Sequence, residues 1–266
     1  MERIRNLNRY QKSVLLLLLA MAVAFTAAYA AVTSRVGYAY RKAILLPQEE
    51  SGAVVYSGRI RGESAVFTVT ADKTVTFTYG EKVYGPYTAH EDPTAIPEDR
   101  ADMAEHMTGV ELRDGDEILF RGGVWAGVNA WSGGKEELML FGEDGGFSGL
   151  EITYSTGDGN VYDSEGNVVD EMKPSALEIL ELMRGPVLTH KGVWLGWLGG
   201  VLISLATALS ILFADELFRW NLAFQIRNVR DAEPSEWEIM TRYIAWTLMP
   251  FLALFCYILG LTELAA

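Results

Sequence analysis

Few residues in this sequence have the type and spacing that enzymatic chemistry needs. The chain has three histidines, and His90-Glu91 lacks the second histidine that a zinc-binding helix places four residues after the first. Gly146-Phe147-Ser148-Gly149 is similar to a nucleophile elbow, but its second glycine comes one residue too early. The sequence contains no GxxxxGK[ST] phosphate-binding loop. These patterns predict no cofactor and no specific reaction.

Acidic residues in the middle of the chain leave an enzyme as the alternative. Asp102, Glu105 and His106 are close in sequence and carry the groups that acid–base catalysis uses. Two carboxylates that converged in a cleft would favour a membrane-tethered hydrolase of envelope polymer or peptide. An acidic surface without such a pair would favour a non-enzymatic protein.

The stretch GDGNVYDSEGNVVDE, residues 157–171, is rich in oxygen ligands of the kind that calcium prefers. Asp158, Asp163 and Glu165 are its metal candidates. The EF-hand register fails, because no glycine falls at the sixth position from either aspartate. We therefore favour a solvent-exposed hairpin that joins residues 160–162 to 168–169.

Two tryptophans form the candidate ligand-binding pair. Trp125 and Trp131 are six residues apart, and an even spacing places side chains on one face of a strand. Two indole rings on one face could stack on a sugar ring, which makes a glycan-binding module a second alternative. The competing interpretation is that both rings belong to a hydrophobic core, where aromatic side chains are common.

Three apolar stretches interrupt the polar sequence of 266 residues. Each is close to the ~20 residues that an α-helix needs to cross a bilayer. We assign transmembrane helices to residues 13–34, 191–214 and 243–262. The sequence thus predicts an α+β membrane protein in which three transmembrane helices carry a mostly β domain, residues 35–190, between the first and the second. The lipid bilayer is its first expected partner.

Basic residues near the predicted spans indicate the orientation, because Lys and Arg favour the cytoplasmic side. The side with residues 1–12 and 215–242 has eight of them, and the opposite side has five. We expect a bacterial-type plasma-membrane protein with a cytoplasmic basic tail (1–12) and a cytoplasmic amphipathic helical loop (215–242). The β domain and the tail 263–266 would be extracytoplasmic. The first span then acts as a signal anchor, with cleavage after Ala30 as the alternative.

The acidity of the chain belongs to the predicted outer domain. Residues 35–190 hold 13 Lys and Arg and 27 Asp and Glu, which is a net charge of −14, and the whole chain carries −13. Nucleic acid needs basic surfaces, so we exclude it as a partner. The single cysteine, Cys256, lies in the third apolar stretch, so no disulfide within the chain can stabilise the domain.

Alternating apolar and polar residues predict that the outer domain is mostly β. The pattern is clearest in residues 64–79, where two alternating runs flank Asp72-Lys73 as in a hairpin. Further strands are expected at 53–60, 82–89, 109–112, 117–120, 124–131, 137–141 and 150–155. Helices are expected near 98–107 and 175–184. The second helix has a capping box made by Ser175 and Glu178 and ends at Gly185-Pro186.

The most regular pattern in the chain concerns helix packing. Small residues recur at every fourth position of the second span: Gly192, Gly196, Gly200, Ser204 and Ala208. Helices in lipid associate by close packing of such residues. The first span has its own small residues, Ala20, Ala24 and Ala28, so we expect these two spans to pack on each other. A membrane-protein partner or a homo-oligomer formed through the second span is the alternative.

The scarcity of catalytic patterns and the predicted architecture together favour a non-enzymatic function. We expect an integral membrane protein whose acidic extracytoplasmic domain binds a ligand. We expect this protein to be a sensor-like or accessory subunit of a membrane assembly. The cytoplasmic helical loop would contact the partner.

Overall fold

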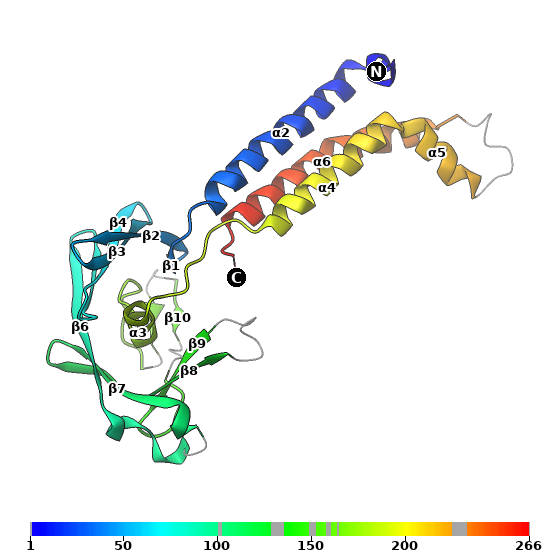
Figure 1. Cartoon of the computed structure of the whole chain (residues 1–266). Helices are drawn as coiled ribbons and strands as arrows, with labels where there is room; N and C mark the ends of the chain where they lie inside the picture. The colour runs from blue at the N-terminus through cyan, green and yellow to red at the C-terminus, as the bar shows by residue number, and fades with distance from the viewer. Residues whose placement is uncertain are drawn as a thin grey trace. The chain divides into compact units, whose positions relative to one another are not determined.

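The computed structural model describes residues 2–100, 103–128, 136–148, 153–157, 161–163, 165–224 and 233–265. The chain forms two compact units (Figure 1). One unit comprises Met1–Val36 and Thr189–Ala266 and is helical. The other comprises Gly37–Leu188 and is built mainly of β-strands. A mixed α+β fold is therefore confirmed.

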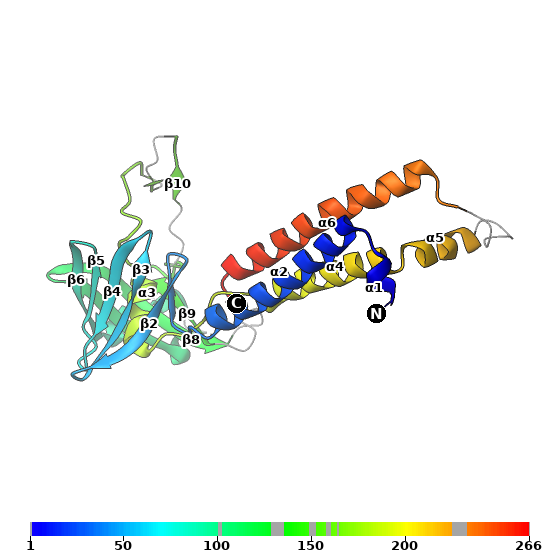
Figure 2. The same ribbon diagram turned by 90° about the horizontal axis from the view of Figure 1, so that it is seen from above.

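Within the described residues of the helical unit, three helices are long and apolar enough to cross a membrane. They are α2 (Arg9–Thr33), α4 (Trp194–Leu212) and α6 (Glu236–Thr262), which pack side by side (Figure 2). Asn8 caps α2 and Ser235 caps α6, because each side chain accepts a hydrogen bond from the backbone N–H three residues later. These helices indicate a multi-pass membrane protein.

Two shorter helices accompany the long ones. They are α1 (Glu2–Asn6) and α5 (Ala214–Ala223), and α5 follows α4 almost without a break. The side chain of Arg242 joins α5 to α6: it is 3.3 Å from Asp215, 3.1 Å from Glu238, and lies over the ring of Phe218. Helix is therefore present at both ends of the predicted loop 215–242, and residues 225–232 lie outside the described part.

In the described residues, the β unit contains one antiparallel sheet of nine strands that follow each other in chain order. Each strand pairs with the next, as in a meander. The strands are β1 (Tyr38–Tyr40), β2 (Ala43–Glu50), β3 (Ala53–Ile60), β4 (Glu63–Val69), β5 (Val75–Tyr79), β6 (Lys82–Glu91), β7 (Met107–Asp114), β8 (Glu117–Val128) and β9 (Glu136–Gly142). Two short strands, β10 (Tyr154–Ser155) and β11 (Val161–Tyr162), form a separate pair.

The predicted hairpin of residues 64–79 shows how alternation builds this sheet. Phe67 of β4 lies opposite Phe77 of β5, and Val69 lies opposite Val75. All four side chains are buried, and the two phenylalanine rings stack with centroids 4.1 Å apart. The apolar face of the sheet is the inner face of a curl, which closes around the helix α3 (Ala176–Arg184) (Figure 1).

Several strands differ from the sequence-based expectation. Strands β1 and β2 were not predicted, because β1 has only three residues and β2 contains Pro47 and ends in two glutamates. The strands expected at 117–120 and 124–131 are one strand, β8. Gly122 lies inside it because a side chain there would collide with the carbonyl of Phe141. This glycine permits close strand approach and does not mark a turn.

The prediction of a single helix near 98–107 is wrong. The described residues form short 3-10 helices, η2 (Glu98–Arg100) and η3 (Ala104–His106), after η1 (Pro93–Ala95). This connection buries Ala95 and Pro97 but no apolar stripe at helical spacing. Backbone hydrogen bonds such as Asp92 N–H to the Gly109 carbonyl tie it to β7.

Candidate functional site

Helix α3 lies on the concave side of the curled sheet (Figure 1). Ser175 and Glu178 form the predicted capping box, and Gly185, with φ of 93°, ends the helix. Four side chains within little more than one helical turn are buried: Ile179, Leu180, Leu182 and Met183. Burial covers a wide arc because strands contact the helix on more than one side.

Polar contacts from the sheet hold the segment that leads into α3. The Tyr40 hydroxyl donates to the Met172 carbonyl over 2.9 Å. The Arg41 guanidinium donates to the Lys173 carbonyl over 3.1 Å and pairs with Glu178 at 2.8 Å. Lys82 pairs with Asp170 at 3.1 Å. These contacts fix the direction of α3 and thus of the side chains at its far end.

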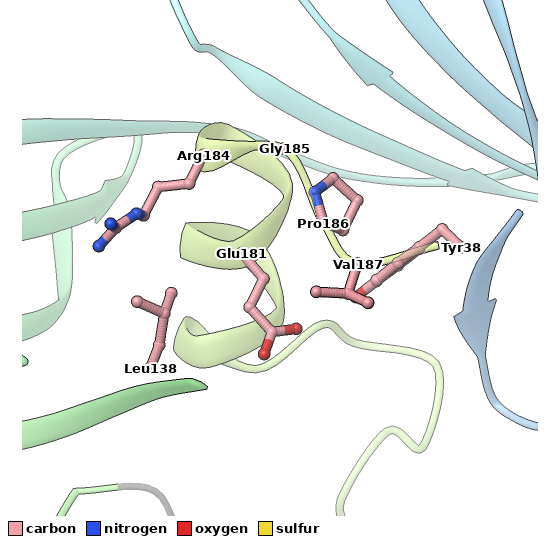
Figure 3. A pocket seen from close by; sticks show the side chains of 7 residues that line it. All are labelled: Tyr38, Leu138, Glu181, Arg184, Gly185, Pro186 and Val187. Carbon is pink, nitrogen blue, oxygen red and sulfur yellow. The ribbon is translucent and has the colours of Figure 1, made fainter. Parts of the chain in front are cut away.

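A cavity of about 220 Å³ lies beside the C-terminal turn of α3 (Figure 3). Tyr38 comes from β1, Leu138 from β9, and the rest from the end of α3 and the residues after it. The lining residues are Tyr38, Leu138, Glu181, Arg184, Gly185, Pro186 and Val187. Arg184 and Val187 are exposed, so the cavity opens to solvent. Its walls combine polar surface with apolar surface from Leu138, Pro186 and Val187 in similar measure, and Glu181 supplies a carboxylate.

Glu181 is the chemically distinctive group of this cavity. Within the described residues its carboxylate makes no hydrogen bond and no ion pair, although Arg184 is one turn further along the same helix. Figure 3 shows the two side chains directed apart. An uncompensated carboxylate that is partly buried favours either a proton or a positively charged partner.

Electrostatics point the same way. Burial raises the pKa of the Glu181 carboxyl above its usual value, and the nearby carboxylates of Glu178 and Glu137 raise it further. Tyr38, which shares the cavity, is 4% exposed, and burial raises the pKa of its phenol as well. The surroundings of Glu181 therefore disfavour added negative charge and favour a cation beside its carboxylate, on the side away from Arg184.

Arg184 also lines a second cavity, of about 370 Å³. Here Leu180 and Met183 of α3 face Val124 of β8, and His90 with Glu91 comes from the end of β6. The last turn of α3 thus separates two cavities with different polar groups. We centre the candidate site on the first cavity because its carboxylate has no partner among the described residues.

Only Trp125 of the predicted tryptophan pair lies among the described residues. Trp125 is partly buried and lies opposite Met107 and Met139 in the sheet, with its ring against Gly127. Its neighbour in sequence, Val124, belongs to the inner core, so Trp125 lies on the opposite face of β8, away from α3. Trp131 lies outside the described residues, so the pair stays a prediction.

The predicted metal candidates are partly described. Asp158 lies outside the described residues. The carboxylate of Asp163 accepts hydrogen bonds from the side-chain amide of Asn167 and from the backbone N–H groups of Asn167 and Glu165, and these bonds lower its pKa. It therefore closes the turn after β11, as in the favoured hairpin, and Tyr162 bridges to Val168. No group of three His, Cys, Asp or Glu arranged for a metal ion occurs in the described part of the chain.

The acids of the enzyme alternative do not share one cleft with Glu181. Glu105 and His106 are exposed on η3, and Asp102 lies outside the described residues. Carboxylates do converge elsewhere: Asp92, Glu111 and Glu143 all contact the guanidinium of Arg121, with Asp92 at 2.7 Å. Hydrogen bonds from Thr94 lower the pKa of Asp92, and the Arg121 guanidinium, which neutralises this group, lowers it further.

The small residues of α4 face α6 of the same chain. A side chain at Gly196 would collide with Gly260, and one at Gly200 would come within 2.5 Å of the Tyr257 ring. Ser204 is buried and donates to the Gly200 carbonyl, Ala208 is partly buried, and Gly192 lies near Thr33 at the end of α2.

The first and second spans pack on each other as expected, and the Trp197 indole of α4 donates a hydrogen bond to Thr26 of α2. The expected alanine face does not carry this contact, since Ala20 and Ala24 are exposed. Helix α2 packs instead through larger side chains, with the rings of Phe25 and Tyr257 stacked at 4.7 Å. Gly260 and the ring of Tyr257 on α6 fill the space beside Gly196 and Gly200 of α4.

Sequence reasoning passed over Glu181 altogether. Its signal was present, because Glu181 stands between Leu180 and Leu182 in a helix that has apolar residues on several sides. An acid within such a helix becomes buried once the helix is enclosed. Comparison with protein-family models, with curated proteins and with solved structures finds no match for this chain.

Proposed function

We propose that this chain is a membrane-anchored, non-enzymatic binding protein whose β unit binds a small organic cation at Glu181. The observation that carries the proposal is the carboxylate of Glu181, which faces a solvent-open cavity and has no partner among the described residues. An amine bound there would supply the missing counter-charge. Such a pair gains from the partial burial of Glu181, because charge-assisted hydrogen bonds are stronger where water is partly excluded.

The lining of the cavity supports an amine with a short apolar tail. Leu138, Pro186 and Val187 offer apolar contact, and Tyr38 adds an aromatic ring. Nearby Glu178 and Glu137 add negative potential at the carboxylate. Ligand sites commonly combine such apolar walls with one or two polar groups that set orientation.

We further propose that the β unit is extracytoplasmic and that the chain is a sensor-like or accessory subunit. The support is the excess of basic residues beside the predicted cytoplasmic ends of the spans. The α5–α6 hairpin, held by Arg242, would then present a cytoplasmic contact surface to a partner.

A series of alkylamines from methylamine to hexylamine tests the binding site. Calorimetry on the full chain in lipid nanodiscs should show affinity that rises with chain length, by up to about 0.8 kcal/mol for each buried methylene, until the cavity is filled. Glu181→Gln keeps the size of the side chain and removes its charge, so it should lower amine affinity at least tenfold.

Two controls separate the site from partition into lipid. Matched n-alkanols have the same tails without the charge and should bind weakly to both proteins. Glu165→Gln, in the exposed turn after β11, should bind amines as the unmodified protein does. Equal amine affinity in the unmodified protein and Glu181→Gln would refute the proposal.

A further inference from the structure

A third concavity of the β unit differs in charge from the cavity at Glu181. It has a volume of about 420 Å³ and is lined by basic residues from three separate chain segments: Arg41 and Lys42 in the β1–β2 turn, Arg61 in the β3–β4 turn, and Lys173 before α3. Two acids, Asp170 and Glu171, also line it, so the lining carries a net charge of about +2. This is unexpected in a segment whose net charge is −14.

The backbone at these basic turns is strained. Arg41, Lys42 and Arg61 have φ values of 45°, 64° and 52°, in the left-handed region where tight hairpin turns favour Asn or Gly. The chain thus places basic side chains where other residues would relax the turn. Non-glycine residues held in this region often mark functional positions.

The four cations have different partners. The guanidinium of Arg41 is occupied by contacts within the chain, because it donates hydrogen bonds to the carbonyls of Glu171 and Lys173 and pairs with Glu178. Arg61 pairs with Glu171 at 2.5 Å, but its side chain remains 66% exposed. Lys42 and Lys173 have no acidic partner among the described residues. Arg41 therefore shapes the concavity. Lys42 and Lys173 remain available to a ligand, and Arg61 stays accessible although it is paired with Glu171.

We infer that this concavity binds a phosphate group. A phosphate monoester carries about −1.5 to −2 charges at neutral pH, which matches the net charge of the lining. Lysine ammonium groups bind phosphate as mobile point charges, and Arg61 can add a directed hydrogen bond. The site is separate from the cation site at Glu181, since the two cavities share no lining residue.

The test uses the full chain in detergent with inorganic phosphate as the probe, at constant ionic strength. Calorimetry should show saturable binding to the unmodified protein. Lys42→Gln with Lys173→Gln should weaken it at least tenfold, and each single substitution should give part of that loss. Lys73→Gln is the matched control, because Lys73 is also an exposed turn lysine with positive φ, 65°, but lines another cavity. It should leave phosphate affinity unchanged, as should Glu181→Gln.

A second probe distinguishes a free phosphate from a lipid headgroup. A short-chain phosphatidic acid, kept below its micelle-forming concentration, should bind more tightly than inorganic phosphate if the natural ligand is a headgroup, and no more tightly if it is a free anion. Either result supports a phosphate site. No saturable binding of either probe, or equal loss in Lys73→Gln and the double variant, would overturn the inference.

Discussion

Glu181 shows how a single residue can connect the fold to its ligand. The helix that carries it is enclosed by strands, so its carboxylate loses hydration without gaining a hydrogen bond in the described part of the protein. Asp163 makes the opposite case, because backbone N–H groups stabilise its ionised form. Sequence alone did not separate these two acids, since the difference depends on what surrounds each side chain.

The raised pKa of Glu181 predicts how stability depends on pH. The folded state holds the Glu181 proton more tightly than the unfolded chain, so the free energy of unfolding falls as pH rises from the ordinary glutamate pKa through the raised one. Glu181→Gln should remove this fall and should be the more stable protein above the raised pKa. Urea unfolding of the full chain, followed by the circular dichroism of the β unit across pH 4 to 8, measures both effects.

A second variant serves as the control in this unfolding experiment. Glu165→Gln, in an exposed turn, should follow the unmodified protein at every pH. A pH profile that is identical in the unmodified protein and in Glu181→Gln would mean that the fold does not penalise the charge on Glu181. Added hexylamine should restore stability to the unmodified protein at high pH, because the bound cation favours the ionised carboxylate.

At the scale of helices and strands, the α4–α6 contact depends on glycine. Gly196→Leu with Gly200→Leu should force the two helices apart, at a cost of about 1–3 kcal/mol for each overpacked site. Gly199→Leu is the control on the same helix, since a side chain there would meet only Cys256, at 3.9 Å. Thermal unfolding in nanodiscs should show a lower midpoint for the double variant alone. Equal midpoints for the double variant and Gly199→Leu would contradict this packing.

Local patterns predicted elements well where one face of a strand or one cap decides the outcome. Strand β3 has the predicted bounds, and the Ser175 cap begins a helix where the sequence places it. Local patterns failed to predict the structure of a segment where its contacts with another strand or helix determine that structure. The three residues of β1 depend on β2 for pairing, and the described residues after Pro97 form short 3-10 helices that bury no helical stripe.

For the whole molecule, sequence reasoning reached the architecture but missed the candidate site. Three apolar helices and a β unit between the first and second follow from hydropathy and alternation. The cavity at Glu181 brings together Tyr38, Leu138 and Val187, which are far apart in sequence. Such a set becomes visible only when the sheet has curled around α3.

Native mass spectrometry of the full chain, extracted gently from its own membranes, would show whether the protein carries an amine at Glu181. We expect a small amine-bearing molecule bound in one-to-one ratio to the unmodified protein and absent from Glu181→Gln. Glu165→Gln, purified in parallel, should retain the ligand. A bare chain in all three preparations, or the same bound mass in the unmodified protein and Glu181→Gln, would contradict a cation site at Glu181.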